Sequence, residues 1–163
     1  MVIDISELFS NKKIRKKIQL DLEKDKFFYD NEFIQFSKPV KLDLMLKPID
    51  DEIALTGSME TELLLTCSRC LETFSHSINI KLSEKLSKTL KNEDEDIIFI
   101  NNDRLDLDEI VENNIISMLP IKRICNKDCK GLCQQCGINL NHSTCKCVSD
   151  DVDPRLAKLK ELF

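Results

Sequence analysis

The cysteines constrain this chain more than any other feature of its sequence. Six of the eight lie between Cys125 and Cys147, and the other two form the motif CSRC at Cys67 and Cys70. In a reducing compartment, closely spaced cysteines usually bind a metal ion or perform redox chemistry, whereas secreted proteins use them for disulfides. The interpretation of the thiols therefore depends on where the protein works.

The sequence predicts a cytoplasmic protein. Its first residues, MVIDISELFSNKK, place acids before the apolar residues and lack the long apolar core of a signal peptide. Apolar runs such as ELLLTC are too short to cross a membrane, so we expect no membrane partner. Apolar residues make up 42% and charged residues 33% of the 163-residue chain, which is typical of a globular protein. We therefore expect reduced thiols that bind metal.

Two pairs of cysteines, in CSRC and CQQCG, have the C-x-x-C spacing that lets both sulfurs bind one ion. We divide the thiols into a local set and a set that joins distant parts of the chain. The local set is Cys133, Cys136, Cys145 and Cys147, and the joining set is Cys67, Cys70, Cys125 and Cys129. Two exchanges stay open: Cys129 in place of Cys147, and His142 as a ligand beside Cys145.

Zinc is the expected metal, with about two ions, each held by four thiolates. Neither set has the usual cysteine spacing of a ferredoxin, which disfavours an iron–sulfur cluster. A tetrahedral four-thiolate site leaves no open position for water or a substrate, so we expect both ions to be structural.

The first part of the chain predicts mainly strands. In VKLDLML, residues 40–46, apolar residues recur at every second position, and FSHSINIKL, residues 74–82, has the same period. The turn PIDDE follows the first of these, and DIIFI, residues 96–100, predicts one more short strand. Between them, IALTGSMETELLLTC predicts one long strand or a bent pair, with Gly57 at a bulge or bend. Short breaks between the segments favour an antiparallel meander.

The clearest helix is DLDEIVENNIISMLP, residues 106–120. Asp106 is its expected cap, Glu109 occupies the capping-box position and Pro120 ends it. Its apolar stripe consists of Leu107, Val111, Ile115 and Met118. We also expect a helical turn in ISELFSNKK and a short C-terminal helix in DPRLAKLKELF.

Together these elements predict an α+β fold. Its antiparallel β-sheet, either open or barrel-like, carries one main helix and is followed by a C-terminal cysteine-rich zinc module. We place the α+β domain at residues 1–120 and the zinc-binding module, with its short helix, at residues 121–163.

The formal net charge of −5 excludes the global basic field that is typical of a nucleic-acid-binding protein. Two local runs are nevertheless basic. The first consists of Lys12, Lys13, Arg15, Lys16 and Lys17, and the second, near the cysteines, consists of Lys122, Arg123, Lys127, Lys130 and Lys146. A solvated face is the ordinary interpretation of each run, and weak contact with RNA phosphates is the alternative.

No motif in the sequence assembles an active site, and we predict that the protein is not an enzyme and has no small-molecule substrate. The sequence contains no P-loop, nucleophile elbow or HExxH motif. His76 lies on the apolar face of its predicted strand, where a core or interface histidine is the default and a metal ligand or catalytic base is the alternative.

Two blocks of the sequence resemble the YceD family, described as large ribosomal RNA subunit accumulation proteins. They are CSRCLETF, and LPIKRIC followed by CKGLCQQCGINLN, CKC and DPRLAKL. The resemblance implies a bacterial or plastid ribosome-biogenesis factor that acts by binding, and the first residues, which do not read as a transit peptide, favour a bacterial one. Some family members lack the local cysteine set and have histidines at the positions of Cys125 and Cys129, which implies the same division of ligands and a dispensable local site.

The partners that the resemblance implies are large-subunit ribosomal RNA or its assembly intermediates, and a ribosomal protein. The cysteine-rich module lacks the aromatic residues on which RNA bases usually stack, so we expect weak, salt-sensitive contact with RNA or a protein partner instead. Two alternatives remain: a thiol redox protein that uses Cys67 and Cys70, and a zinc-ribbon adaptor that binds only protein. The redox alternative is disfavoured because CSRC follows a strand, whereas a reactive thiol favours a helix N-terminus.

Overall fold

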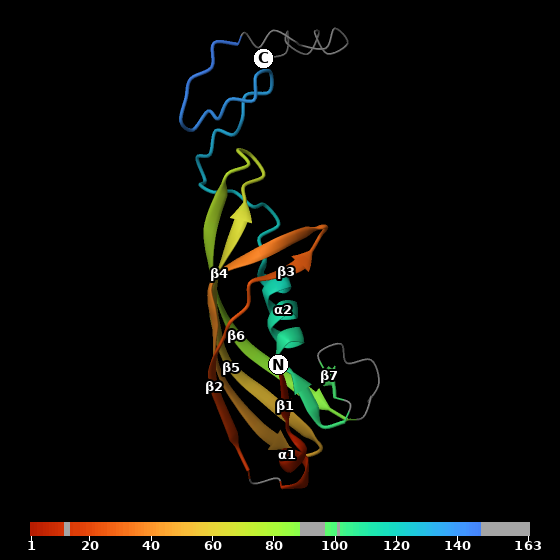
Figure 1. The fold of residues 1–163 in the computed structure, drawn as a ribbon. Helices are drawn as coiled ribbons and strands as arrows, with labels where there is room; N and C mark the ends of the chain where they lie inside the picture. The colour runs from red at the N-terminus through yellow and green to blue at the C-terminus, as the bar shows by residue number, and fades with distance from the viewer. Residues whose placement is uncertain (12–13, 89–96, 101, 148–163) are drawn as a thin grey trace, which may run out of the picture.

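The computed structural model describes residues 1–11, 14–88, 97–100 and 102–147 of the chain. Its centre is a sheet in the order β2-β4-β5-β6-β7, with β3 paired to β4 (Figure 1). The strands are β2 (Lys16–Leu22), β3 (Lys26–Tyr29), β4 (Glu32–Ile49), β5 (Glu52–Thr66), β6 (Thr73–Ser87) and β7 (Ile97–Phe99). Because β2 and β7 are the two ends of this order, the sheet is open and the barrel-like alternative is wrong.

The long strands β4, β5 and β6 form the antiparallel meander that their period-2 pattern predicts. On β4, the alternate residues Val40, Leu42, Leu44 and Leu46 are buried and join the buried face of β5 in one apolar core. Asp50 and Asp51 form the tight turn between β4 and β5, and Asp50 adopts a positive φ of 54°. The turn expected in PIDDE is therefore confirmed.

Gly57 lies at the centre of β5 and has a different role from the expected one. It pairs with Leu44 of β4 and Leu82 of β6 in an unbroken register, so β5 is one long strand without a bulge at this position. A β-carbon at residue 57 would lie only 2.1 Å from the carbonyl oxygen of Asp43. The glycine is required by this close approach of two backbones rather than by a bend.

The strand β7 corrects the expected all-antiparallel topology. It pairs parallel to β6, with Lys85 opposite Ile97. A parallel neighbour requires a crossover connection, and strand periodicity carries no information about such a connection. Outside this sheet, β1 (Val2–Asp4) and β8 (Arg104–Asp106) form a two-stranded antiparallel ribbon.

The main helix, α2 (Leu107–Met118), packs on one face of the sheet, where its buried residues join the apolar core (Figure 1). The Asp106 carboxylate accepts a 3.0 Å hydrogen bond from the Asp108 N–H, which confirms the expected cap. Met118 is 53% exposed, and Ile110 is buried instead. Met118 shares the predicted stripe but lies in the last turn, where the described part of the chain does not cover it.

Two further helical predictions concern the ends of the chain. The short helix α1 (Ser6–Ser10) confirms the helical turn expected in ISELFSNKK, and it buries Leu8 in the core. The C-terminal helix predicted in DPRLAKLKELF lies outside the described residues. Neither α1 nor α2 is both long and apolar enough to cross a membrane.

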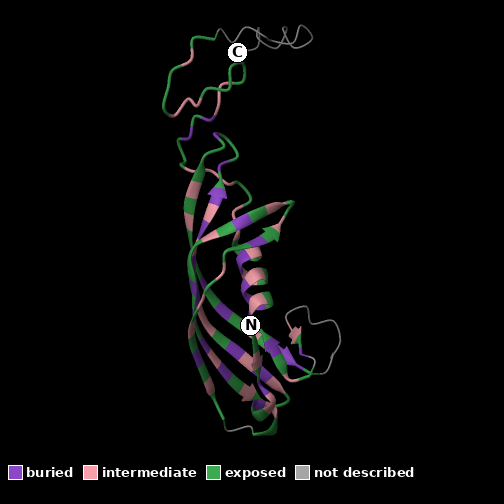
Figure 2. Ribbon diagram, in the orientation of Figure 1, coloured by how far each residue is buried: buried purple, intermediate pink, exposed green. Residues whose placement is uncertain are grey.

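The cysteine-rich segment leaves the end of α2 and extends beyond the end of the sheet at which β5 and β6 are joined (Figure 1). It is largely irregular, with one isolated bridge between Leu132 and Asn139. Figure 2 shows buried residues alternating along the strands, whereas this segment is mostly exposed or intermediate. The division of the chain at residue 120 stays a prediction.

Candidate metal centre

The first group of thiols is built where β5 ends. Cys67 follows Leu63 and Leu65 in the buried alternation of this strand and has no exposed surface. The CSRC turn then leads into β6, and it is closed by a 2.9 Å hydrogen bond from the Leu71 N–H to the Cys67 carbonyl. The sheet thus holds Cys67 in place and presents it to the cysteines that follow α2.

The sulfurs of Cys67, Cys70, Cys125 and Cys129, here called the first tetrad, all lie within 4.8 Å of one another. The Cys67 and Cys129 sulfurs are 3.9 Å apart, and the Cys70 and Cys125 sulfurs are 3.6 Å apart. A tetrahedral zinc site with bonds of about 2.3 Å has sulfur–sulfur distances of about 3.8 Å. A disulfide requires about 2.0 Å, so the geometry fits a four-thiolate metal site.

The electrostatics of the first tetrad favour thiolates in the presence of a cation. Burial raises the pKa of Cys67, but backbone N–H groups of Cys125, Cys70 and Arg69 outweigh it and lower the pKa to about 6. At Cys70, the Glu72 N–H lowers the pKa, but burial and the neighbouring sulfurs raise it to about 12. Without a cation, the negative charge of one thiolate therefore opposes ionisation of the other thiols. A bound divalent ion would compensate this repulsion.

The second tetrad consists of Cys133, Cys136, Cys145 and Cys147, whose sulfurs also lie within 4.8 Å of one another. The Cys145 sulfur is 3.4 Å from the sulfurs of both Cys133 and Cys136. Cys136 and Cys147 are exposed, so this tetrad is more open to solvent than the first.

A tight turn in CQQCG shapes the second tetrad. The Gly137 N–H donates to the Cys133 carbonyl over 2.9 Å, and Gly137 adopts a φ of 70°, which glycine tolerates without strain. The N–H groups of Cys136 and Gln135 lower the pKa of Cys133 to about 6. The same conflict between sulfurs recurs, because Cys145 and Cys136 raise the pKa of Cys147 to about 12.

The two tetrads contain the same cysteines as the two sets that the spacing favours. Neither of the two exchanges left open by the sequence, Cys129 in place of Cys147 or His142 as a ligand, is observed. Cys129 lies in the first tetrad. His142 is not a member of either tetrad, and its Nε2 atom lies 2.8 Å from a carboxylate oxygen of Glu72. Each tetrad can hold a metal ion, while the identity and occupancy of that ion stay predictions.

Several residues that the sequence did not single out connect the tetrads. The Leu132 N–H donates to the Arg69 carbonyl over 3.1 Å, which joins the cysteine-rich segment to CSRC. The Asn141 side chain donates from Nδ2 to the Cys129 sulfur over 3.4 Å, and it is the largest cause of the lowered pKa of Cys129. The GINLN motif, which carries part of the family resemblance, is the only local signal of this role.

The basic residues near the cysteines are not equivalent. Lys122, Lys127, Lys130 and Lys146 are exposed. Arg123 forms an ion pair with Glu32, its side chain is only 16% exposed, and its carbonyl accepts a 2.8 Å hydrogen bond from the Ser68 N–H. Arg123 therefore joins the first tetrad to the sheet, and its charge is already compensated.

The described residues of the first basic run lie at the start of β2, near the opposite end of the molecule (Figure 1). Lys16 pairs with Leu46, which is opposite Leu55 of β5, and Cys67 comes twelve residues after Leu55 along the chain. At about 3.3 Å per strand residue, this corresponds to about 40 Å. The Lys16 ammonium donates to the Asp4 carbonyl, and Arg15 and Lys17 are exposed. Lys12 and Lys13 lie outside the described residues.

An exposed aromatic pair lies on the hairpin of β3 and β4. Phe28 and Phe33 are opposite each other, both 60% exposed, with ring centroids 5.1 Å apart. The Lys26 ammonium lies 4.5 Å from the centre of the Phe33 ring. The turn residues Asp30 and Asn31 have positive φ values of 51° and 61°, as a two-residue hairpin turn requires. The sequence interpretation missed this hairpin, although its short alternating strands are a recognisable signal.

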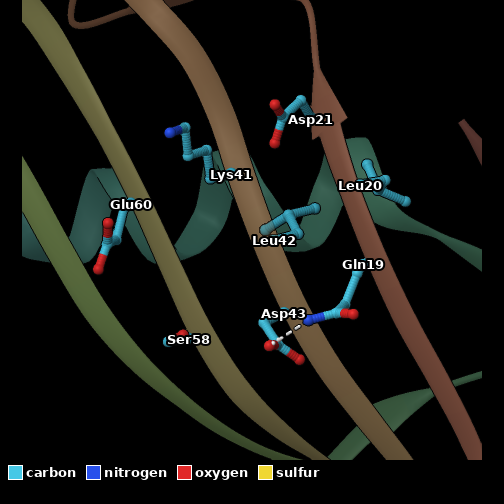
Figure 3. Close-up of a pocket in the computed structure, with 8 residues that line it drawn as sticks. All are labelled: Gln19, Leu20, Asp21, Lys41, Leu42, Asp43, Ser58 and Glu60. Atoms are coloured by element: carbon cyan, nitrogen blue, oxygen red, sulfur yellow. Dashed lines mark hydrogen bonds between the residues drawn. The ribbon is translucent and has the colours of Figure 1, made fainter.

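The hollow over β2, β4 and β5 and the side chain of His76 are not part of either tetrad. Figure 3 shows a hollow over β2, β4 and β5, with α2 behind the strands, in which the Gln19 amide donates to Asp43 over 2.7 Å. Three carboxylates and one lysine line it, so it would repel RNA phosphates. His76 is half-buried on β6 opposite Leu63 and belongs to neither tetrad, so its role as a core or interface histidine stays a prediction.

Comparison with known proteins gives one family and a few relatives. The family described as large ribosomal RNA subunit accumulation protein YceD matches residues 55–163, which include all eight cysteines. Uncharacterized proteins of Mycobacterium tuberculosis and Mycobacterium bovis are each 29% identical over 131 residues, or 75% of this chain and 61% of the relative. An uncharacterized protein of Mycobacterium leprae is 25% identical over 139 residues, or 80% of this chain and 62% of the relative. The chain thus spans about three fifths of these relatives, and no solved structure matches it.

Proposed function

Because this chain belongs to the YceD family of large ribosomal RNA subunit accumulation proteins, we propose that it is a ribosome-biogenesis factor that acts by binding rather than by catalysis. The observation that carries the proposal is the family match, which spans both tetrads and the segment between them. The proposed partners are large-subunit ribosomal RNA or its assembly intermediates, met in the cytoplasm. The mycobacterial relatives are uncharacterized and add no partner.

The metal part of the proposal is one structural zinc ion in each tetrad. The donor sets support it, because four sulfurs at tetrahedral spacing suit zinc and the backbone N–H groups around Cys67 and Cys133 stabilise thiolates. The ion supplies positive charge that lets the four thiols ionise together. The residues of the first tetrad then clamp the end of the sheet to the segment after α2, and those of the second fold that segment on itself.

The RNA part of the proposal uses two surfaces at the same end of the molecule. Lys122, Lys127, Lys130 and Lys146 provide exposed charge for phosphates around the tetrads. The Phe28 and Phe33 rings provide exposed faces on which unpaired bases can stack, with Lys26 beside them. The ion pair of Arg123 with Glu32 joins the hairpin to the cysteine-rich segment, so the lysines and the aromatic pair lie on two parts of the chain that contact each other.

Depletion of the protein in its host tests the proposal most directly. We expect large-subunit ribosomal RNA to fall relative to small-subunit RNA, and tagged protein to co-sediment with large-subunit precursors in sucrose gradients. Unchanged RNA levels together with absence from precursor fractions would contradict the proposal. Elemental analysis of the purified chain tests the metal part, for which about two zinc ions per chain and no visible absorption are expected.

The redox and adaptor alternatives predict different results in the same experiments. Disulfides in place of metal would favour a redox protein that uses Cys67 and Cys70, although the complete burial of Cys67 weighs against an accessible nucleophile. Zinc-loaded protein that captures a ribosomal protein but no RNA would favour the adaptor.

A further inference from the structure

We propose that the two tetrads bind metal cooperatively, because the loop between Cys136 and Cys145 of the second tetrad contacts ligands of the first. Asn141 contacts the ligand Cys129 directly, and His142 contacts Glu72, which lies beside the ligand Cys70; both residues are in this eight-residue loop. The inference rests on the proposed function to the extent that both tetrads must bind a metal ion.

Asn141 makes the more direct of the two contacts. Its Nδ2 atom donates to the Cys129 sulfur over 3.4 Å. Its Oδ1 atom accepts from the Lys130 N–H over 2.7 Å, and its own N–H donates to the Asn139 side chain over 2.9 Å. The bond that Oδ1 accepts from Lys130 orients the amide so that its donor points at a ligand of the first tetrad, and the backbone bond to Asn139 holds this part of the loop in place. Asn141 is therefore a positioning residue for Cys129.

His142 provides a second connection through Glu72. The His142 Nε2 atom is 2.8 Å from Oε1 of Glu72, while Oε2 of Glu72 lies 3.6 Å from the Cys70 sulfur. Glu72 also accepts, through its carbonyl, a 2.9 Å hydrogen bond from the Cys67 N–H. The loop thus reaches the first tetrad from two sides, at Cys129 and beside Cys70.

Metal at the second tetrad fixes the ends of this loop, because Cys136 and Cys145 would bind the same ion. The described loop residues form little regular structure, so without that ion the chain must order Asn141 at its own conformational cost. Metal at the second tetrad therefore lowers the cost of presenting Asn141 to Cys129. By thermodynamic linkage, metal at the first tetrad must favour binding at the second by the same factor.

The expected size of the effect follows from other metal sites. Loss of a hydrogen bond to a metal ligand typically weakens metal affinity by about 10–100-fold. Removal of the second tetrad by Cys136→Ser with Cys147→Ser should therefore weaken zinc binding at the first tetrad by about this factor. Asn141→Ala should weaken the binding of one of the two zinc ions by a similar factor. Adding Asn141→Ala to the variant that lacks the second tetrad should cause little further loss of zinc affinity at the first tetrad.

The test is competition for zinc between a chromogenic chelator of known affinity and the full-length chain, for these variants and the unchanged protein. Asn141→Asp keeps the oxygen that accepts from Lys130 but lacks the donor, so it should lose as much affinity as Asn141→Ala. Ser143→Ala, an exposed change in the same loop, is the matched control and should bind both ions normally. Circular dichroism confirms that each variant keeps its sheet.

The outcomes separate this inference from the proposed function. If both ions bind but the affinity of the first tetrad is unchanged when the second is removed, the coupling is wrong and the metal sites stand. An Asn141→Asp variant with unchanged affinity would likewise overturn the role of Asn141. Absence of zinc from the unchanged protein would refute the metal part of the proposed function, and with it the coupling, while depletion still tests the role in ribosomal RNA accumulation.

Discussion

Gly131 lies directly against Arg69, so that a β-carbon at residue 131 would be 3.0 Å from the Arg69 carbonyl oxygen. The same carbonyl accepts the hydrogen bond from the Leu132 N–H, and Gly131 has a φ of +75°. This backbone contact holds the cysteine-rich segment against CSRC, and we expect the stability of the first tetrad to depend on it.

Gly131→Ala should therefore destabilise the chain more than Gly137→Ala. Both residues have positive φ, which costs a non-glycine residue about 1–2 kcal/mol, but within the part of the chain that the structure describes no atom lies within 4 Å of the β-carbon position at Gly137. Urea unfolding followed by circular dichroism gives the two free energies of unfolding. Equal midpoints for the two variants would show that the contact with Arg69 carries no constraint.

Gly57→Ala should prevent stable folding, because the new β-carbon would meet backbone atoms on the neighbouring strand at 2.1 Å and 2.9 Å. The reduced entropy of the unfolded chain offsets only about 0.4–1 kcal/mol, whereas overpacking against a backbone costs about 1–3 kcal/mol or more. Thr56→Ala, an exposed neighbour, is the control and should change stability by about 0.5 kcal/mol or less. Recovery of soluble, cooperatively unfolding Gly57→Ala protein would refute the prediction.

Cys67→Ser and Cys145→Ser should have different consequences. Cys67 joins the sheet to the segment after α2, so its loss should destabilise the whole fold, whereas Cys145→Ser should loosen the second tetrad, weaken zinc binding at the first only through the proposed coupling, and leave the sheet folded. Thermal unfolding of the sheet and zinc content per chain distinguish the two. Equal global unfolding in both variants would contradict the division into two tetrads.

Charge reversal at the exposed lysines should weaken RNA binding in a salt-dependent manner. The residues to change to Glu, one at a time, are Lys122, Lys127 and Lys130. Each change that removes a phosphate contact should reduce the slope of log affinity against log salt concentration by about 1. Filter binding of a large-subunit ribosomal RNA fragment at several salt concentrations measures this slope. Lys17→Glu, at the far end of the sheet, is the control, and an equal effect there would indicate nonspecific attraction.

Replacement of the exposed aromatic pair should weaken binding of unpaired RNA without changing the salt slope. Phe28→Ala and Phe33→Ala each remove one stacking face, worth about 1–3 kcal/mol per base. Because both rings are 60% exposed, the free energy of unfolding should change little. Phe27→Ala, which removes a buried ring from the core, should instead destabilise the fold. RNA affinity that is unaffected in both exposed variants would exclude stacking on this hairpin.

Local patterns were sufficient for most of the secondary structure and for the membership of the tetrads. The alternation from Val40 to Leu46 predicted the buried face of β4, and Asp106 predicted the start of α2. The spacing of the cysteines favoured the same two groups of four that the structure assembles. These predictions succeed because side-chain period, helix capping and C-x-x-C geometry are set within a few residues of the chain.

The amino-acid sequence by itself determined the family, the long strands and the main helix, and it favoured the division of the cysteines that the tertiary structure then fixed. Only the tertiary structure decided the open sheet with its parallel edge strand β7, the contact of Asn141 with Cys129 and the exposed position of Phe28 beside Phe33. It also decided that Arg123 pairs with Glu32, ninety-one residues earlier in the chain. Such contacts join residues that are distant in sequence, and their positions depend on how the whole core packs rather than on any local period.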